Sequence, residues 1–260
     1  MDIHKPKPWR GFREFLKEYL IIVVGVLTAL GAEAVVENLH WRHLAEQHDE
    51  DLRAGSKQIL GLAVERLAAS PCVRGELKRI GAALSQSSGP WTGTNPGPDT
   101  APADYFHSLS MPGRPWPSAP WESAIADGAL AHLPRERVSL YAFMFKTAHD
   151  IQAPQQDVQL GRTDLAPLAF DRTLSAEERA HFLALVSRID ESEAMADSMA
   201  RSAIRQAGVR TKDLRPDPSD VKQRMEALKT RVGMNGCIRE VDVEAIIKTN
   251  IITYRPRALN

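Results

Sequence analysis

A run of apolar residues close to the N-terminus constrains this chain more than any other feature of its sequence. Residues 19–32 carry no charged side chain, and the apolar character extends over 15–36 with only Lys17, Glu18 and Glu33 interrupting it near the ends. As a helix, 22 residues measure about 33 Å, enough to cross a bilayer core of about 30 Å. We therefore expect a transmembrane helix over residues 15–36.

The charges on either side of this run predict its orientation. The preceding segment has an excess of cations, and the segment beyond Glu33 is rich in Asp and Glu. Cytoplasmic flanks of membrane helices are enriched in Lys and Arg. Residues 1–14 are thus expected to form a basic cytoplasmic N-terminus of a bacterial inner-membrane protein, with residues 37–260 in the periplasm.

Two other interpretations of the apolar run stay open. Ala32-Glu33-Ala34 has the small-x-small form of a signal-peptidase site after an apolar segment. A buried or interfacial helix of a soluble protein is the other alternative. Helical periodicity continues beyond Ala34, which favours an uncleaved membrane helix.

Small residues predict one contact face on this helix. Gly25, Ala29 and Glu33 recur every four residues, and Ala32 lies on the adjoining strip. Small side chains let a second helix approach closely, so this face is a candidate interface with another subunit or with a second copy of the chain. The alternative is that small residues are simply common in membrane helices.

The remaining sequence predicts a mainly α-helical fold. No proline occurs between Pro8 and Pro71, so the membrane helix is expected to continue as an amphipathic stalk to about Ser70. The stalk has a stripe of apolar residues at helical spacing: Leu52, Ile59, Leu60, Ala63, Val64 and Leu67. A short helix over 73–84 is then expected to fold back antiparallel.

A long Pro-rich loop over 87–120 is the exception to the helical pattern. Its aromatic residues, Trp91, Tyr105, Phe106 and Trp116, are expected to pin it against the helical body. Long ordered loops often bind ligands, which makes this loop a candidate binding surface.

Helical patterns resume after the loop and predict a helical-bundle domain. Ser175 followed by Glu178 forms a capping box at the start of a long helix, and the stretch PDPSD at 216–220 predicts a further helix start. The expected helices cover 121–130, 134–151, 157–170, 175–206 and 221–232, and 241–254 is interpreted as helix in preference to strand.

Composition and motifs bound the function. The 33 basic and 33 acidic residues give a formal net charge of zero, so nucleic acid is not an expected partner. No phosphate-binding loop, dinucleotide glycine pattern, nucleophile elbow or HExxH sequence occurs. No cofactor is expected.

Two Glu-x-x-His pairs raise the alternative of a metal-dependent enzyme. Glu37 with His40, and Glu178 with His181, have the spacing that places a carboxylate and an imidazole on one helical face. Such pairs build di-iron sites in helical bundles, but chance alone gives about half an instance in a chain with this many Glu and His residues, so two are not strong evidence for the motif. The simpler interpretation is a solvated helix surface.

The two cysteines, Cys72 and Cys237, lie 165 positions apart, each expected in a turn at a helix end. In a periplasmic domain they are candidates for a disulfide, and buried free thiols are the alternative.

Two stretches carry a family resemblance: EYLIIVVGVLTAL at 18–30, and WESAIADGALAHLP at 121–134. They resemble a poorly characterised family of bacterial single-pass membrane proteins with a helical extracytoplasmic domain. The resemblance covers about the first 55 residues and 116–150. It implies a topology and assigns no catalytic residue. In the second stretch, Gly128 is expected to end a helix, and four apolar residues are expected to pack on the body: Trp121, Ile125, Leu130 and Leu133.

Together these features predict an accessory or scaffold subunit of a larger inner-membrane complex, whose partners are lipids and other membrane subunits or a second copy. A periplasmic ligand-sensing module is the alternative, although the segment before the helix is too short for an output domain. The metal enzyme described above is the third.

Overall fold

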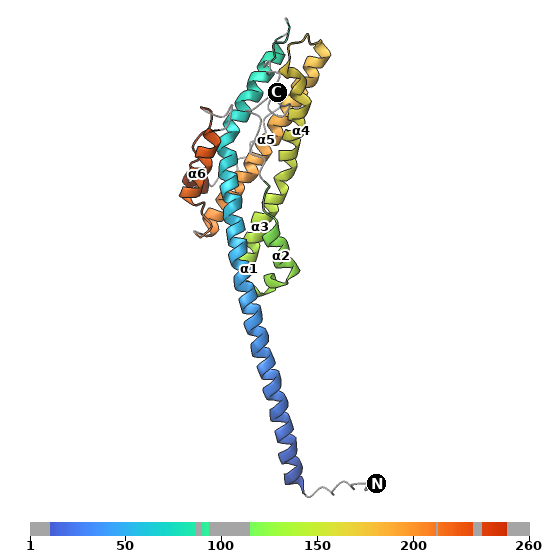
Figure 1. The fold of residues 1–260 in the computed structure, drawn as a ribbon, viewed down its shortest axis with the longest axis vertical. Coiled ribbons are helices and arrows are strands. Elements are labelled where there is room, and N and C mark those ends of the chain that lie inside the picture. The colour runs from blue at the N-terminus through green and yellow to red at the C-terminus, as the bar shows by residue number, and fades with distance from the viewer. Residues whose placement is uncertain (1–10, 87–89, 94–114, 212, 231–235, 249–260) are drawn as a thin grey trace.

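The structure, a computed structural model, describes residues 11–86, 90–93, 115–211, 213–230 and 236–248. It is mainly α-helical, as the sequence predicts, and one helix runs along most of its length (Figure 1). The helices, including two short 3₁₀ helices labelled η, are α1 Phe12–Ser85, α2 Ala119–Ala126, η3 Ala129–His132, α3 Arg135–Asp150, α4 Gln152–Leu165, η4 Ala166–Ala169, α5 Ala176–Arg210, α6 Pro218–Lys229 and α7 Val243–Lys248.

The other helices gather around the C-terminal half of α1, and its N-terminal half projects alone (Figure 1). Burial begins at Ala45, and the predicted stripe from Leu52 to Leu67 is buried throughout. Most of the predicted stalk is therefore packed in the core of the body. Only a short exposed part of α1 separates the apolar segment from the body.

The helix does not break at Pro71, and the prediction of a separate helix folding back over 73–84 is wrong: α1 continues to Ser85. Proline lacks an N–H and weakens the turn before it. A distant segment also contacts that turn, because the backbone N–H of Arg239 donates to the carbonyl of Ala68 at 3.1 Å. Buried contacts on both sides of Pro71 also stabilise the helix, as tertiary packing commonly does.

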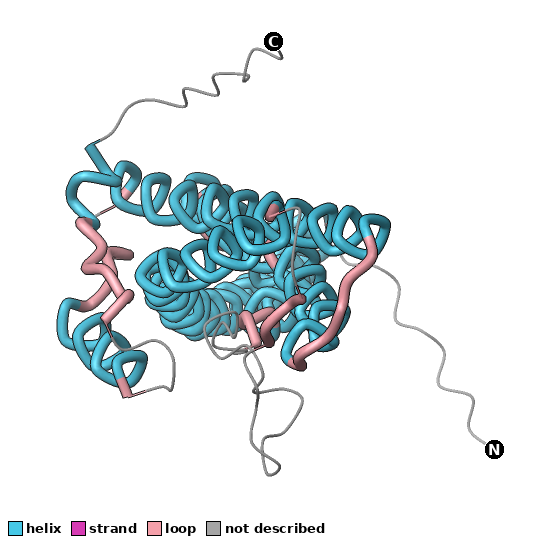
Figure 2. The backbone as a smooth tube through the Cα atoms, turned by 90° about the horizontal axis from the view of Figure 1, so that it is seen from above, coloured by secondary structure: helices cyan, strands magenta, loops and turns pink. Residues whose placement is uncertain are grey.

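The body is built mainly from α5 packing against α1 and α4. Figure 2 shows its helices lying side by side in a view from above. The contact between α4 and α5 is close at Gly161, where an added Cβ would lie 2.5 Å from Cγ1 of buried Ile189. Glycine is required at this position because a larger residue would collide with Ile189, and not because of its backbone conformation.

Local signals set several helix ends as predicted. Ser175 and Glu178 form the capping box that starts α5, and the Asp217 side chain caps α6 by accepting from the N–H of Ser219. Gly128, with φ of 70°, ends the turn after α2. That helix is shorter than predicted and ends at Ala126, because the chain continues as a 3₁₀ helix beyond Gly128.

The helix predicted over 157–170 begins and ends earlier than expected. It starts at Gln152, directly after α3, and Pro154 lies in its first turn, where a missing N–H removes no intrahelical bond. It ends at Leu165, where the chain tightens into η4. The predicted last helix is described only over α7, and residues 249–254 lie outside the described chain.

The Pro-rich loop is described only at its two ends, and α2 begins before residue 120. Trp91 and Trp116 are buried, as expected. The Trp91 indole N–H donates to the carbonyl of Leu168 at 2.7 Å, and that of Trp116 donates to Gln155 at 2.9 Å. Tyr105, Phe106 and the loop's predicted binding surface lie outside the described residues.

Candidate functional site

The N-terminal half of α1 is the first candidate functional feature. Over residues 12–40 every side chain except that of Val23 is exposed, although most of them between 15 and 36 are apolar. Among the described residues α1 is the one helix long and apolar enough to cross a membrane. No later helix of the described chain covers these apolar side chains. Only lipid or another protein could therefore shield them from water.

The four residues of the predicted contact face lie in this exposed half. Gly25, Ala29, Ala32 and Glu33 are all exposed, and a Cβ added at Gly25 would meet no atom within 4 Å. Glu33 forms no ion pair within the described part of the chain. The described chain itself thus makes no use of this face.

A collar of helical residues contacts α1 just beyond its apolar segment. We define the collar as α2, η3 and the first half of α3, residues 119–141. The indole of Trp41 stacks on the imidazole of His132, with ring centroids 4.4 Å apart and planes at 13°. About two turns further along α1, the collar also holds His48, because the Nε2 atom of His48 lies 2.9 Å from Oδ2 of Asp127. Two separate turns of α1 are therefore fixed against the collar.

The collar also contacts a buried carboxylate of α1. Asp49 accepts hydrogen bonds from the Tyr141 hydroxyl at 2.9 Å, from Arg53 at 2.8 Å and from Arg137. Burial alone would raise the pKa of Asp49, but the bonds from Tyr141 and Arg137 outweigh it and hold that pKa below its ordinary value. Burial and the neighbouring Asp49 raise the pKa of Tyr141 to about 12.

The stretch 121–134 noted for its resemblance forms most of this collar. Trp121 packs against Phe145 with ring centroids 6.0 Å apart, and Leu130 and Leu133 are partly buried against the core. Ile125, however, was expected to pack on the body and is 55% exposed. The face of α2 that packs on the body is instead the one that carries Ala124, which is fully buried.

A buried ionic layer joins α1 to α5 in the middle of the body. Arg66 donates to Oε2 of Glu193 at 2.5 Å, and its Nε atom lies 3.4 Å from Oδ1 of Asp197. The other carboxylate oxygen of Asp197, Oδ2, accepts from the Ser70 hydroxyl. Burial raises the pKa of Glu193 to about 7, against the opposing effect of Arg66. Burial raises the pKa of Asp197 as well. Sequence reasoning missed this layer, since nothing local marks Arg66 or Glu193 as buried.

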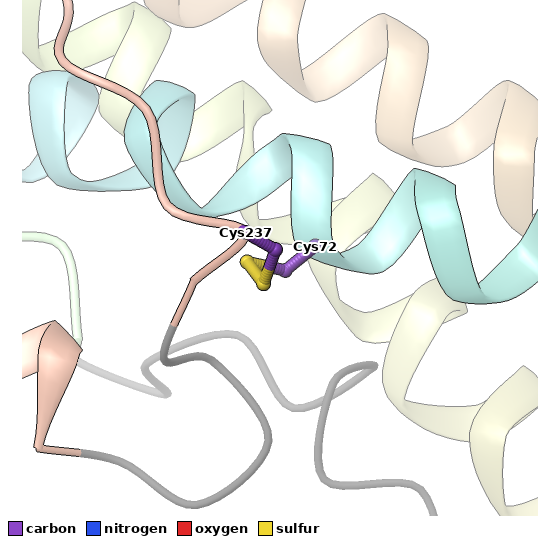
Figure 3. The surroundings of a disulfide bond; sticks show 2 residues. All are labelled: Cys72 and Cys237. Atoms are coloured by element: carbon purple, nitrogen blue, oxygen red, sulfur yellow. A yellow bond between two sulfur atoms is a disulfide. The ribbon is translucent and has the colours of Figure 1, made fainter.

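The structure joins Cys72 and Cys237 in a disulfide, with their Cα atoms 5.1 Å apart (Figure 3). Cys72 lies inside α1 and not in a turn at a helix end, because the helix continues through Pro71. The bond holds the segment before α7 against the same turn whose carbonyl, at Ala68, accepts from Arg239. One stretch of α1 is thus tied to the C-terminal part of the body twice.

The structure does not bring the two Glu-x-x-His pairs together. Glu37 is exposed, 48 residues before the end of α1, which is about 70 Å of helix. Glu178 lies near the C-terminal end of α1, because α5 starts there and runs antiparallel to α1. Its carboxylate belongs to the capping box and pairs with Arg172. Within the described residues no three His, Cys, Asp or Glu side chains are grouped to hold a metal ion.

Comparisons with known proteins return no match: no protein-family model, no curated protein and no solved structure is similar to this chain at a significant level.

Proposed function

We propose that this chain is a single-pass protein of the bacterial inner membrane, and that it acts through contacts as an accessory or scaffold subunit of a larger membrane complex. The observation that carries the proposal is the continuity of α1. Its exposed apolar half and its packed half are one helix, from Phe12 to Ser85. A partner bound in the membrane would therefore be held at a fixed position relative to the body.

The side of the membrane is inferred from two independent features. The cations before the apolar segment favour an N-terminus in the cytoplasm. The Cys72–Cys237 bond favours a body in an oxidising compartment, because disulfides are rare in the cytosol. Both features support a periplasmic body.

The contact face is inferred from the small residues of α1. Gly25, Ala29 and Ala32 would let another helix approach closely, and Glu33 would accept a hydrogen bond or an ion pair from it. The chain has no second membrane-spanning helix among the described residues. The partner is then a transmembrane helix of another subunit or of a second copy.

The native cysteines provide a test of location. Intact cells and spheroplasts are treated with a maleimide-polyethylene glycol before and after reduction, and the mobility of the protein is compared on gels. We expect labelling of Cys72 and Cys237 only after reduction. Labelling that appears only after the spheroplasts are lysed, and not on intact spheroplasts after reduction, would contradict a periplasmic body.

The contact face is tested by two identical substitutions on different sides of α1. Ala29→Leu fills the small face, whereas Ala34→Leu lies about 140° around the helix axis from it. After extraction in mild detergent, we expect wild type and Ala34→Leu to elute as the same complex and Ala29→Leu to lose it. A monomeric, unaccompanied wild-type protein, or equal behaviour of the two variants, would contradict the subunit role.

A further inference from the structure

A cleft of about 740 Å³ opens beside the collar, between the start of α3 and the end of α5. Arg53 of α1, Arg135 and Arg137 of α3, and Arg210 of α5 line it. Arg210 also donates to the Ser139 hydroxyl at 3.3 Å, which links its two walls. The volume lies within the range of small-molecule sites.

The cations of this cleft are only partly neutralised. Asp49 pairs with both Arg53 and Arg137 from α1. Glu136 and Asp213 also line the cleft, but neither forms an ion pair with its arginines. Within the described part of the chain, Arg135 and Arg210 have no carboxylate partner.

Two guanidinium groups in the cleft are therefore available to an anion. Arginine binds phosphate and carboxylate groups in a bidentate manner, and its planar guanidinium gives such contacts a defined geometry. Because Arg135 and Arg210 come from two different helices, an anion between them would contact both walls of the cleft.

The cleft also has an apolar part. Leu140 and Leu214 are buried in its lining, and Tyr141 contributes to the same lining. We propose that the cleft binds a small organic anion that carries a phosphate or similar group for Arg135 and Arg210 and an apolar part for these three side chains. The inference is independent of the proposed function, because it does not depend on the membrane contact face.

A lipid headgroup is not the expected source of the anion. Arg137, which lines the cleft, pairs with Asp49 of α1. Asp49 lies 13 residues after Val36, the last residue of the expected span, and 13 residues of helix measure about 20 Å. The headgroup layer extends only about 5–8 Å beyond the hydrocarbon core. A soluble anion can reach the cleft, and a bilayer lipid in its ordinary position cannot.

Calorimetric titration of the full chain, in nanodiscs of zwitterionic lipid at low salt, tests the proposal with phenyl phosphate as the probe. We expect binding, with inorganic phosphate weaker and phenyltrimethylammonium not binding. Replacing both available cations, Arg135→Gln with Arg210→Gln, should weaken phenyl phosphate binding by about tenfold or more. Glu136→Gln removes an acidic group from the lining and should tighten binding.

The matched control is Arg201→Gln, an exposed arginine on the opposite side of α5 from Arg210. It should leave the affinity for phenyl phosphate within about twofold, because its charge lies outside the cleft. Nanodiscs containing anionic lipid should also leave that affinity unchanged. Absence of binding, equal losses in the double variant and the control, or competition by anionic lipid would each overturn the proposal.

Discussion

Arg66 of α1 and Glu193 of α5, 127 positions apart, meet at 2.5 Å in the interior of the body, and neither is more than 4% exposed. A buried ion pair costs desolvation energy and contributes little net stability. Losing one partner is nevertheless destabilising, because the other charge stays buried alone. The pair therefore disfavours any register of α1 against α5 that separates these two side chains.

Replacing Glu193 with Gln should change how stability depends on pH. The pKa of Glu193 rises from an ordinary 4.5 to about 7 on folding, so the folded state binds its proton more tightly than the unfolded state does. Stability from this group is therefore greatest below about pH 4.5 and is lost as pH rises towards 7. The free energy of unfolding of wild type minus that of Glu193→Gln should fall by on the order of 1–3 kcal/mol between about pH 5 and 8.

Denaturant unfolding of the full chain in detergent, followed by circular dichroism at several pH values, measures this difference. Glu191→Gln is the control, because Glu191 is an exposed glutamate two positions earlier on α5. Its substitution should change the free energy of unfolding little, because its side chain is exposed. Parallel pH profiles for wild type and Glu193→Gln would show that Glu193 does not titrate as inferred.

Asp49→Asn should have the opposite pH dependence. The pKa of Asp49 is below its ordinary 3.8, so its stabilising effect is present above that value and is lost as pH falls through the lower, folded pKa. At neutral pH the substitution should cost about 1–3 kcal/mol, since it weakens charged hydrogen bonds from Arg53 and Arg137. Denaturant titration should show this cost shrinking in strong acid. Asp51→Asn, an exposed neighbour, should have little effect at either pH.

Features set by a few adjacent residues could be predicted from the sequence. The capping box of Ser175 and Glu178, the cap at Asp217 and the turn at Gly128 all depend on residues at most three positions apart. The apolar stripe of α1 could also be predicted, since its period alone identifies the buried face.

Features that depend on distant partners could not be predicted. Pro71 stays inside a helix that is buried on both sides of it, and Arg239, 168 positions beyond it, donates to Ala68 in the turn before the proline. In the same way, the cations of the cleft come from three helices, and only the folded chain shows that Arg53, Arg135 and Arg210 are neighbours. Ordinary surface residues in the sequence thus become parts of a site.

Removing the disulfide should destabilise the body. The disulfide joins residues that are 165 positions apart. A disulfide that closes a loop of this length stabilises the folded state by about 2–5 kcal/mol, chiefly by constraining the unfolded chain. Cys72→Ala with Cys237→Ala should lower the free energy of unfolding by that amount, measured by denaturant titration. Dithiothreitol should have the same effect on wild type and none on the double variant. An equal response of both proteins to the reductant would contradict this role.

Two glycines within helices should respond to alanine in opposite ways. At Gly161 a Cβ would lie 2.5 Å from Cγ1 of Ile189, in the core between α4 and α5, so Gly161→Ala should cost about 1–3 kcal/mol despite the better helix propensity of alanine. At exposed Gly75 of α1 a Cβ would meet no atom within 4 Å, so Gly75→Ala should stabilise by about 0.5–1 kcal/mol. Denaturant titration of both variants measures these changes. A gain of stability in Gly161→Ala would mean that α4 and α5 lie further apart than they do here.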